Sequence, residues 1–226
     1  MTSKIMLPKK DDNGEYYLSY SQVKSWQELK GFNTGKPGKH EYIMRYFFGE
    51  SFEDRGGFGQ FGKEVEDYIT LRESSDKFST EEKKLLDTIQ PLGKFQVEFK
   101  LDYGDFYVLG YIDDAVEDLS YIRDYKTASE KSKEKYYKDD YTQLDVYALA
   151  VRQKTGKIPK LEVKVIERLG NGFKGGRDVM TVGDKIWTIE RETSEERLES
   201  IYKNIEMTAI EISDYYKVFL KLNKVI

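Results

Sequence analysis

The stretch GYIDDAVEDLSYIRDYK, residues 110–126, decides the fold prediction. It joins two runs rich in aromatic and β-branched residues, which are typical of strands, through the polar turn Glu117–Ser120. A third run of the same kind precedes them and ends at the turn Asp102–Asp105. The sequence therefore predicts an antiparallel meander of three strands, Phe95–Leu101, Phe106–Val116 and Tyr121–Thr127.

The turn sets which residues face each other in the predicted hairpin. If the turn is symmetric about residues 118–119, Asp113 faces Asp124 and Asp114 faces Arg123. Opposed residues have Cβ atoms roughly 5 Å apart, so the two aspartates repel unless one is protonated or a cation lies between them. We expect a divalent cation there, and a structural ion pair between Asp114 and Arg123 on the other face. A register slip of one residue would reverse these roles.

Lys126 lies two residues beyond Asp124, on the same face of the strand. An acidic residue, any residue and a lysine follow one another six times in this chain, so the pattern alone carries little information. Only Asp124–Lys126 lies on a predicted strand where a second carboxylate is placed to meet it. The lysine would orient or help deprotonate a water and stabilise developing negative charge, while divalent ions held by the aspartates activate that water. Phosphodiester hydrolysis is the chemistry that suits these groups.

The composition limits which metal such a site can hold. The chain of 226 residues has no cysteine, which excludes disulfides, thiolate zinc sites and cysteine-ligated iron–sulfur clusters. His40 is its only histidine, so sites with several histidines are excluded as well, and we expect it to be solvated in a loop. The 41 acidic residues offer oxygen ligands, which suit magnesium, manganese or calcium. The net charge is −4, but Arg152–Arg177 holds eight basic and two acidic residues, either as a phosphate-facing strip or as a solvated face.

Helical periodicity on both sides of the meander predicts an α/β fold, in which a central mixed sheet has helices on both faces. We expect one domain over residues 1–226, with a helical part at about 18–90, a catalytic core at about 94–169 and a C-terminal hairpin and long helix at about 177–226. The expected elements outside the meander are a helix starting at Ser19, a loop Gly31–Gly38, helices around 58–69, Thr80–Leu86 and Tyr141–Gln153, a strand Lys160–Leu169, a hairpin loop Gly170–Gly176 and a helix from about Ser194 to Leu222.

Three blocks in combination resemble the RecB-type branch of the PD-(D/E)XK nuclease superfamily. They are Gly110-Tyr111-Ile112-Asp113, then Asp124-Tyr125-Lys126, then the Gln-x-x-x-Tyr pattern of residues 143–147. Upstream, Leu18-Ser19-Tyr20-Ser21 is similar to the serine-rich opening of the branch, and Gly62-Lys63-Glu64-Val65-Glu66 resembles its first helical metal block. The likeness runs from about residue 18 to residue 150.

The resemblance implies a restriction-endonuclease-like core and assigns roles to individual residues. Asp113, Asp124 and Lys126 would be catalytic, and the metal, Mg²⁺ or Mn²⁺, would be bound by both aspartates, Glu66 and the main-chain carbonyl of Tyr125. Glu64 or Asp67 replaces Glu66 if the helix register differs. The resemblance also implies that Gln143 and Tyr147 contact DNA near the cut; the alternative is that they pack their helix on the sheet.

Two departures from the family pattern are informative. RecB-type members often have histidine at the position of Glu66, whereas phage-type exonucleases of the superfamily have glutamate, so this chain resembles the latter. Members with an iron–sulfur cluster need cysteines, which are absent, so no such cluster is expected.

The expected function is a Mg²⁺-dependent exonuclease acting on DNA ends in recombination or repair, encoded by a phage and able to work with a recombination partner protein. No apolar run reaches the roughly 18 residues of a membrane span, and the N-terminus is too polar for a signal peptide, so a cytoplasmic protein is expected, in the host cell if a phage encodes it. The alternatives are a structure- or sequence-specific endonuclease, a catalytically silent DNA-binding subunit and a calcium-stabilised structural domain.

Overall fold

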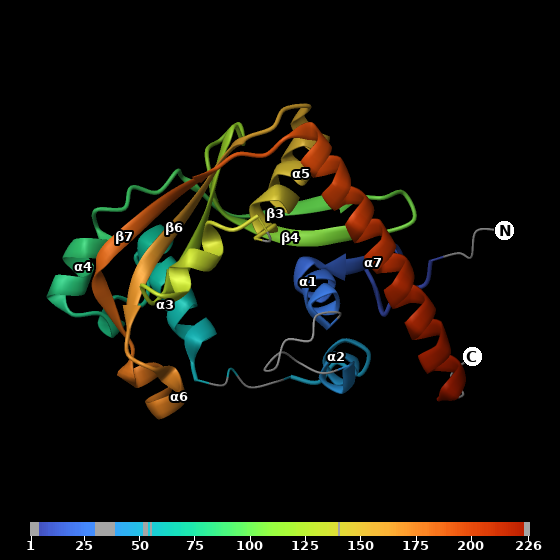
Figure 1. Cartoon of the computed structure of the whole chain (residues 1–226), viewed down its shortest axis with the longest axis horizontal. Helices are drawn as coiled ribbons and strands as arrows, with labels where there is room; N and C mark the ends of the chain where they lie inside the picture. The colour runs from blue at the N-terminus through green and yellow to red at the C-terminus, as the bar shows by residue number, and fades with distance from the viewer. Residues whose placement is uncertain (1–4, 30–38, 52–53, 55, 140, 224–226) are drawn as a thin grey trace. The chain divides into compact units, whose positions relative to one another are not determined.

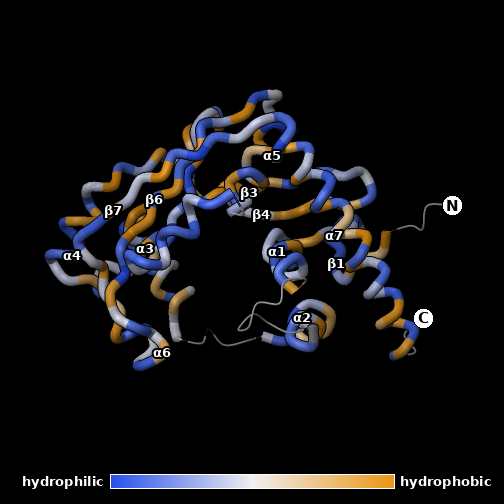
Figure 2. Tube along the Cα trace, viewed as in Figure 1, coloured by the Kyte–Doolittle hydropathy of each residue, from blue (hydrophilic) through white to orange (hydrophobic). Residues whose placement is uncertain are grey.

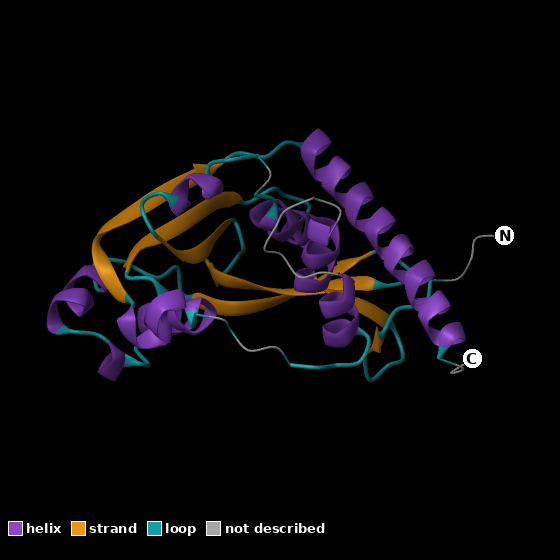
Figure 3. Ribbon diagram, turned by 60° about the horizontal axis from the view of Figure 1, so that its bottom comes forward, coloured by secondary structure: helices purple, strands orange, loops and turns teal. Residues whose placement is uncertain are grey.

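The computed structural model describes residues 5–29, 39–51, 54, 56–139 and 141–223. It has the predicted mixed α/β fold, with a mixed sheet flanked by helices (Figures 1 and 3). Three short 3₁₀ turns, Ser75–Lys77, Ser132–Tyr136 and Gly176–Val179, accompany the regular elements. The α-helices and β-strands are, in chain order, β1 Lys9–Lys10, β2 Tyr16–Ser19, α1 Tyr20–Leu29, α2 Lys39–Tyr46, α3 Phe58–Leu71, α4 Thr80–Leu86, β3 Lys94–Asp102, β4 Tyr107–Ala115, β5 Tyr121–Ala128, α5 Gln143–Thr155, β6 Lys160–Leu169, α6 Gly172–Gly175, β7 Thr181–Arg191 and α7 Glu195–Leu222.

The chain forms two compact units, which are described separately. Unit 1 comprises Met1–Phe52, Glu98–Gly110 and Ser194–Ile226, and unit 2 comprises Glu53–Val97 and Tyr111–Thr193. The strands β3 and β4 each contribute residues to both units. The division of one domain into three consecutive parts stays a prediction.

Unit 1 pairs β1 antiparallel with β2, and β2 parallel with the first residues of β4. The helix predicted to start at Ser19 is α1, and its capping box is present, because Ser19 N donates to Gln22 Oε1 (2.9 Å) and Gln22 N donates to Ser19 Oγ (3.3 Å). The long helix α7 packs against α1, where Trp26 Nε1 donates to Glu211 Oε2. Hydrophobic and hydrophilic residues alternate along α7, as its amphipathic pattern predicts (Figure 2).

Unit 2 continues from the last residues of β4 through β5, β6 and β7. β4 and β5 are antiparallel, β5 and β6 are parallel, and β6 and β7 are antiparallel. Strand β6 therefore pairs with β5 along one edge and with β7 along the other, and eight of its ten residues are in register with β5. The predicted strand Lys160–Leu169 coincides with β6.

Helices cover both faces of the sheet of unit 2. The side chains of Tyr125 and Ile166 form one core with α3 and α4, including Phe61 and Leu86. Because neighbouring strand residues point to opposite faces, Asp124 lies on the other face, where the start of α5 bonds to it. Tyr125 therefore faces α3 and α4, whereas Asp124 faces the start of α5.

The structure corrects two local predictions. His40, which the sequence placed in a loop, lies exposed in α2, a short helix whose first three residues, Lys39–Glu41, are all polar. The glycine-rich segment Gly170–Gly176 does connect an antiparallel pair, but it contains the single turn α6. The loop predicted at Gly31–Gly38 lies outside the described residues. In the described part of the chain, no helix combines the length and the apolar character that crossing a membrane requires.

Candidate active site

The hairpin of β4 and β5 has the predicted register. Asp114 pairs with Arg123 and Ala115 with Ile122, so the turn is symmetric about residues 118–119. Leu119 adopts a left-handed conformation (φ 59°) that closes the turn. The ladder ends at Asp114, and the next amide on the facing strand, Tyr125 N, donates to the carboxylate of Asp113 (3.0 Å to Oδ2) instead. Asp113 is thus held beside Asp124 at the point where the two strands stop pairing.

The ammonium of Lys126 lies among three oxygens. Its Nζ is 2.7 Å from Asp124 Oδ1, 3.1 Å from the carbonyl oxygen of Tyr125 and 4.0 Å from Asp113 Oδ2. Burial alone would lower the pKa of Lys126, but the carboxylates of Asp124 and Asp113 raise it above its ordinary value. The lysine is therefore charged, and it offsets one of the two carboxylate charges.

Of the two aspartates, Asp113 is the one whose negatively charged form is disfavoured. Burial is the largest cause that raises its pKa well above the ordinary aspartate value, and the charge of Asp124 raises it further. Lys126 and the amide of Tyr125 act in the opposite direction. A further positive charge near Asp113 would therefore be favourable.

Asp124 is fully buried (0% exposed) and its carboxylate is held from the start of α5. Tyr141 Oη donates to Oδ2 (2.7 Å), and Gln143 Nε2 donates to Oδ1 (3.0 Å). Gln143 in turn donates to Oη of Tyr147 (2.5 Å), which is buried one helical turn further on. Gln143 and Tyr147 thus interact as their spacing predicts, and in this arrangement they orient Asp124.

Tyr141 was not predicted to be part of the site. It precedes α5 and is one of 18 tyrosines, so no local pattern distinguishes it. Its hydroxyl reaches Asp124 only because the fold brings together residues 17 positions apart. Arg191 on β7 fixes the chain segment that leads to Tyr141, because it donates hydrogen bonds to the carbonyl oxygens of Tyr136, Lys138 and Tyr141.

The Tyr141→Phe variant should unfold more easily than the wild type. It removes one hydrogen bond to a buried carboxylate, and bonds to charged groups contribute about 1.5–3 kcal/mol. Urea denaturation would measure this loss, with Tyr137→Phe as the control because Tyr137 is an exposed tyrosine of the same segment. Equal stability of the two variants would show that the bond from Tyr141 to Asp124 contributes nothing.

Glu66 on α3 acts electrostatically on the hairpin. Burial raises its pKa, while Lys63, a hydrogen bond from Gln96 Nε2 and the charge of Lys126 lower it, and Glu66 in turn raises the pKa of Asp113. Gln96 has a left-handed backbone inside β3 (φ 47°), a strained conformation for a residue with a side chain. The geometry therefore brings Glu66 into the electrostatic environment of the aspartates.

The two alternatives to Glu66 have other partners. Glu64 is buried and forms an ion pair with Arg177, and Asp67 pairs with Lys63 (2.6 Å). Neither is among the charges that act most strongly on Asp113. Of the three acidic residues of this block, Glu66 is best placed to act on the hairpin.

The oxygens around Lys126 suit a hard divalent cation. The carboxylates of Asp113 and Asp124 and the carbonyl of Tyr125 already surround one positive charge, and all three are ligand types that Mg²⁺ and Mn²⁺ prefer. Within residues 5–223, gaps excepted, no three acidic or histidine side chains gather closely enough to form a complete metal site. Glu66 is thus near the hairpin but not assembled with both aspartates into one ligand group.

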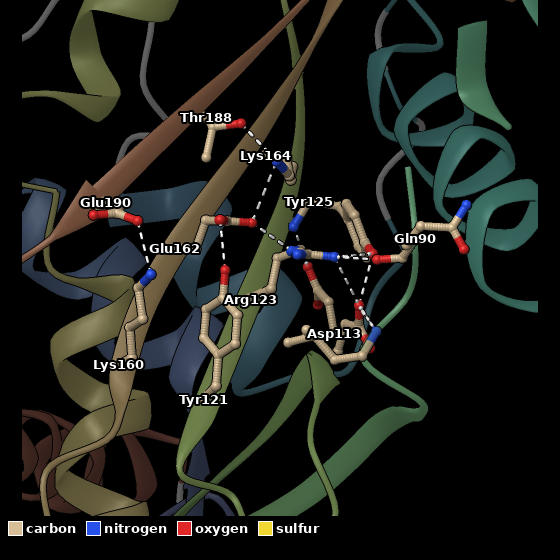
Figure 4. A network of polar contacts seen from close by, with 12 residues as sticks. Gln90, Asp113, Tyr121, Arg123, Tyr125, Lys160, Glu162, Lys164, Thr188 and Glu190 are labelled. Atoms are coloured by element: carbon tan, nitrogen blue, oxygen red, sulfur yellow. Dashed lines mark hydrogen bonds and ion pairs between the residues drawn. The ribbon is translucent and has the colours of Figure 1, made fainter. Parts of the chain in front are cut away.

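A buried network supports the hairpin from its other face (Figure 4). Arg123 Nε donates to Glu162 Oε1 (2.5 Å), and its Nη1 donates to the carbonyl of Gln90 (2.8 Å) and lies 3.4 Å from Asp114 Oδ2. Tyr125 Oη also donates to Asp114 Oδ2 (2.7 Å). The predicted ion pair of Asp114 and Arg123 is confirmed, and Tyr125 ties this network to the main chain that faces Asp113 and Lys126.

Comparison with known proteins agrees with this geometry. The sequence model of the PD-(D/E)XK nuclease superfamily matches residues 47–216. A solved structure from Eubacterium rectale, provisionally named an exonuclease, is similar to this chain with a TM-score of 0.53 and 16% sequence identity, over 90% of this chain and 85% of that one. At this identity the likeness concerns the fold. No significantly similar sequence is found among curated proteins.

Proposed function

Because the chain belongs to the PD-(D/E)XK nuclease superfamily, we propose that it is a Mg²⁺-dependent exonuclease that hydrolyses phosphodiester bonds at DNA ends in recombination or repair. We also propose that it is phage-encoded and works in the cytoplasm of the host cell, with a recombination partner protein. One observation carries the nuclease part: a charged lysine, two aspartates and a main-chain carbonyl converge at the end of the β4–β5 hairpin. The name of the Eubacterium rectale protein is what favours an exonuclease.

Each residue has a role that follows from its contacts. Asp113, Asp124 and the carbonyl of Tyr125 would hold the metal, with Glu66 as a further ligand. The metal would supply charge neutralisation of the phosphate and activation of the attacking water. Because its pKa is raised, Lys126 is a proton-carrying donor, suited to stabilising the negative charge that develops on the phosphate oxygens.

To bind the metal, Asp124 needs a fixed orientation. Residues of α5 and of the segment before α5 supply this orientation. Tyr141 and Gln143 occupy both carboxylate oxygens, so the side chain cannot rotate without breaking two hydrogen bonds. We propose that Gln143 and Tyr147 in addition contact DNA near the cut, as the resemblance implies. Tyr147 is buried, so its contact would pass through Gln143.

The function is tested with linear and closed-circular DNA of one sequence, incubated with Mg²⁺, with Mn²⁺ and with a chelator. We expect linear DNA to be degraded from its ends in either metal, circles to survive, and the chelator to stop the reaction. Cut circles would favour an endonuclease. Intact linear DNA in both metals, with protein shown to be folded, would contradict the nuclease proposal and leave a silent DNA-binding subunit.

A further inference from the structure

The tip of the β6–β7 hairpin presents an aromatic ring to solvent. Phe173 in α6 is 76% exposed. Figure 1 shows α6 beyond the ends of β6 and β7. The turn is nonetheless anchored, since Asn171 Oδ1 accepts a hydrogen bond from Phe173 N (3.1 Å). Gly172 lies so close to the main chain of Gly56 that an added Cβ would be 1.9 Å from the carbonyl oxygen. The fold therefore fixes the position of the exposed ring already in the unbound protein.

Phe173 is the outer member of a stack of three side chains. Its ring packs edge-on against Phe58 at the start of α3, with centroids 4.9 Å apart. The guanidinium of Arg168 lies 4.3 Å from the centroid of the same Phe58 ring. Arg168 Nε is buried and has no hydrogen-bond partner in the described part of the chain, which is unusual for a buried donor. Another nitrogen of the same guanidinium, Nη1, donates to Met180 Sδ (3.5 Å). The stack thus places a guanidinium beside an aromatic pair.

The charge around the stack suits a polyanion. The segment Arg168–Arg177 has three basic residues and no acidic one. Arg177 is occupied by its ion pair with Glu64, which leaves Arg168 beside Phe58 and the exposed Lys174 next to Phe173 in the chain. Phosphate groups are the anions that such a pair of cations would meet on the proposed substrate.

Two connections relate the stack to the candidate active site within unit 2. Phe58 and Glu66 are eight residues apart on α3, which is about 12 Å along the helix axis, or three to four base steps of 3.4 Å. Buried Tyr136 lies within the electrostatic reach of Lys126, Asp124 and Arg168, which all act on its pKa. A DNA strand at the hairpin could therefore extend to the stack.

We propose that Phe173, Phe58, Arg168 and Lys174 bind an unpaired DNA strand, with a base stacked on Phe173 and its phosphates at the two cations. This rests on the proposed function, since DNA is the substrate it implies. An unpaired strand is favoured over a duplex because a ring can stack only on a base whose face is free. The site would hold the strand a few nucleotides from the cut.

The test measures binding without cleavage. Anisotropy of a short fluorescein-labelled single strand and of the matching blunt duplex is recorded in chelator for the wild type, Phe173→Ala and Arg168→Gln. The control is Phe48→Ala, since Phe48 is also exposed and also packs edge-on against a second ring, Phe219.

Phe173→Ala should weaken binding of the single strand about tenfold, within the range for the loss of one base–aromatic stack, and change duplex binding less. Arg168→Gln should lower the slope of log Kd against log salt by about 0.7, the value for one phosphate on a single strand. Lys174→Gln gives the same readout at an exposed position, in case Arg168→Gln disturbs the packing of Phe58.

Unchanged single-strand binding by Phe173→Ala, or a loss no greater than that of Phe48→Ala, would overturn the inference. So would a wild type that does not bind the strand. An equal loss on strand and duplex would overturn the assignment to unpaired DNA. Because binding is measured in chelator, these results are independent of cleavage of linear DNA, which tests the proposed function.

Discussion

The Asp124→Asn variant should cleave linear DNA at least about 10³-fold more slowly than the wild type. Asp124 both bonds to Lys126 and is a proposed metal ligand, so the substitution removes a charge on which two other groups depend. Loss of one group that stabilises transition-state charge already lowers the rate about 10²–10³-fold. The amide can still bond to both neighbours, with its oxygen accepting from Gln143 and its NH₂ donating to the hydroxyl oxygen of Tyr141. This should preserve the fold, and circular dichroism checks it.

Lys126→Met separates the role of the lysine from that of the aspartate. We expect its cleavage rate to fall about 10²–10³-fold, because the charged donor is lost while the chain length is kept. Mn²⁺ should still raise the melting temperature of Lys126→Met, whereas it should no longer raise that of Asp124→Asn. Lys100→Met is the matched control, since Lys100 follows Glu98 with the same spacing on β3. Full activity of Lys126→Met would refute the assignment of Lys126 as catalytic.

Arg123→Ala should lower the free energy of unfolding by about 3–5 kcal/mol, the range for removing one partner of a buried ion pair. Its guanidinium is the cation between Asp114 and Glu162, and all three side chains are at most 7% exposed. Without it, Glu162 keeps only the more distant ammonium of Lys164 (3.6 Å) as a counter-charge, and Asp114 keeps only hydrogen-bond donors such as Tyr125 Oη. Urea denaturation at neutral pH measures the difference.

The same region supplies the control for this prediction. Lys160 and Glu190 form an ion pair of similar length, 2.7 Å, but their side chains are 53% and 66% exposed (Figure 4). Lys160→Ala should therefore change stability by less than about 1 kcal/mol. If Arg123→Ala is no more destabilising than Lys160→Ala, the buried network does not stabilise the hairpin.

The effect of Arg123 should also depend on pH. Burial alone would raise the pKa of Glu162, but Tyr121 and Arg123 hold it below its ordinary value of 4.5. A lowered pKa means that the charged form is favoured in the folded state, so this stability is present above pH 4.5 and is lost as the pH falls through the lowered value. The difference between the wild type and Arg123→Ala should shrink in that acidic range.

The sequence predicts the hairpin well because its determinants are local. A polar turn between two strand patterns fixes the register, and the register alone brings Asp113 beside Asp124 and pairs Asp114 with Arg123. The helix predicted around residues 58–69 likewise places Glu66 about two turns from Phe58 on the sequence alone.

The rest of the site depends on contacts that no local pattern encodes. Tyr141 reaches Asp124 from a segment positioned by Arg191 of a distant strand. The sequence predicts that the two aspartates need a positive charge beside them, but it does not show that the Lys126 ammonium lies 2.7 Å from Asp124 and 4.0 Å from Asp113, because these distances depend on the side-chain conformation. The exposed ring of Phe173 could not be distinguished from a core residue, since exposure is a property of the fold.

The two faces of the β4–β5 hairpin make its register critical. A shift of β5 by one residue along β4 would turn every side chain of β5 to the opposite face, moving Arg123 into the site and Asp124 into the core. β5 is also in register with β6 over eight residue pairs, which opposes such a shift. Residues inserted between Val116 and Tyr121 should therefore lengthen the turn and leave both faces as they are. Homologues should accordingly vary in the length of this turn, as surface loops commonly do, while keeping the alternation of Arg123, Asp124, Tyr125 and Lys126.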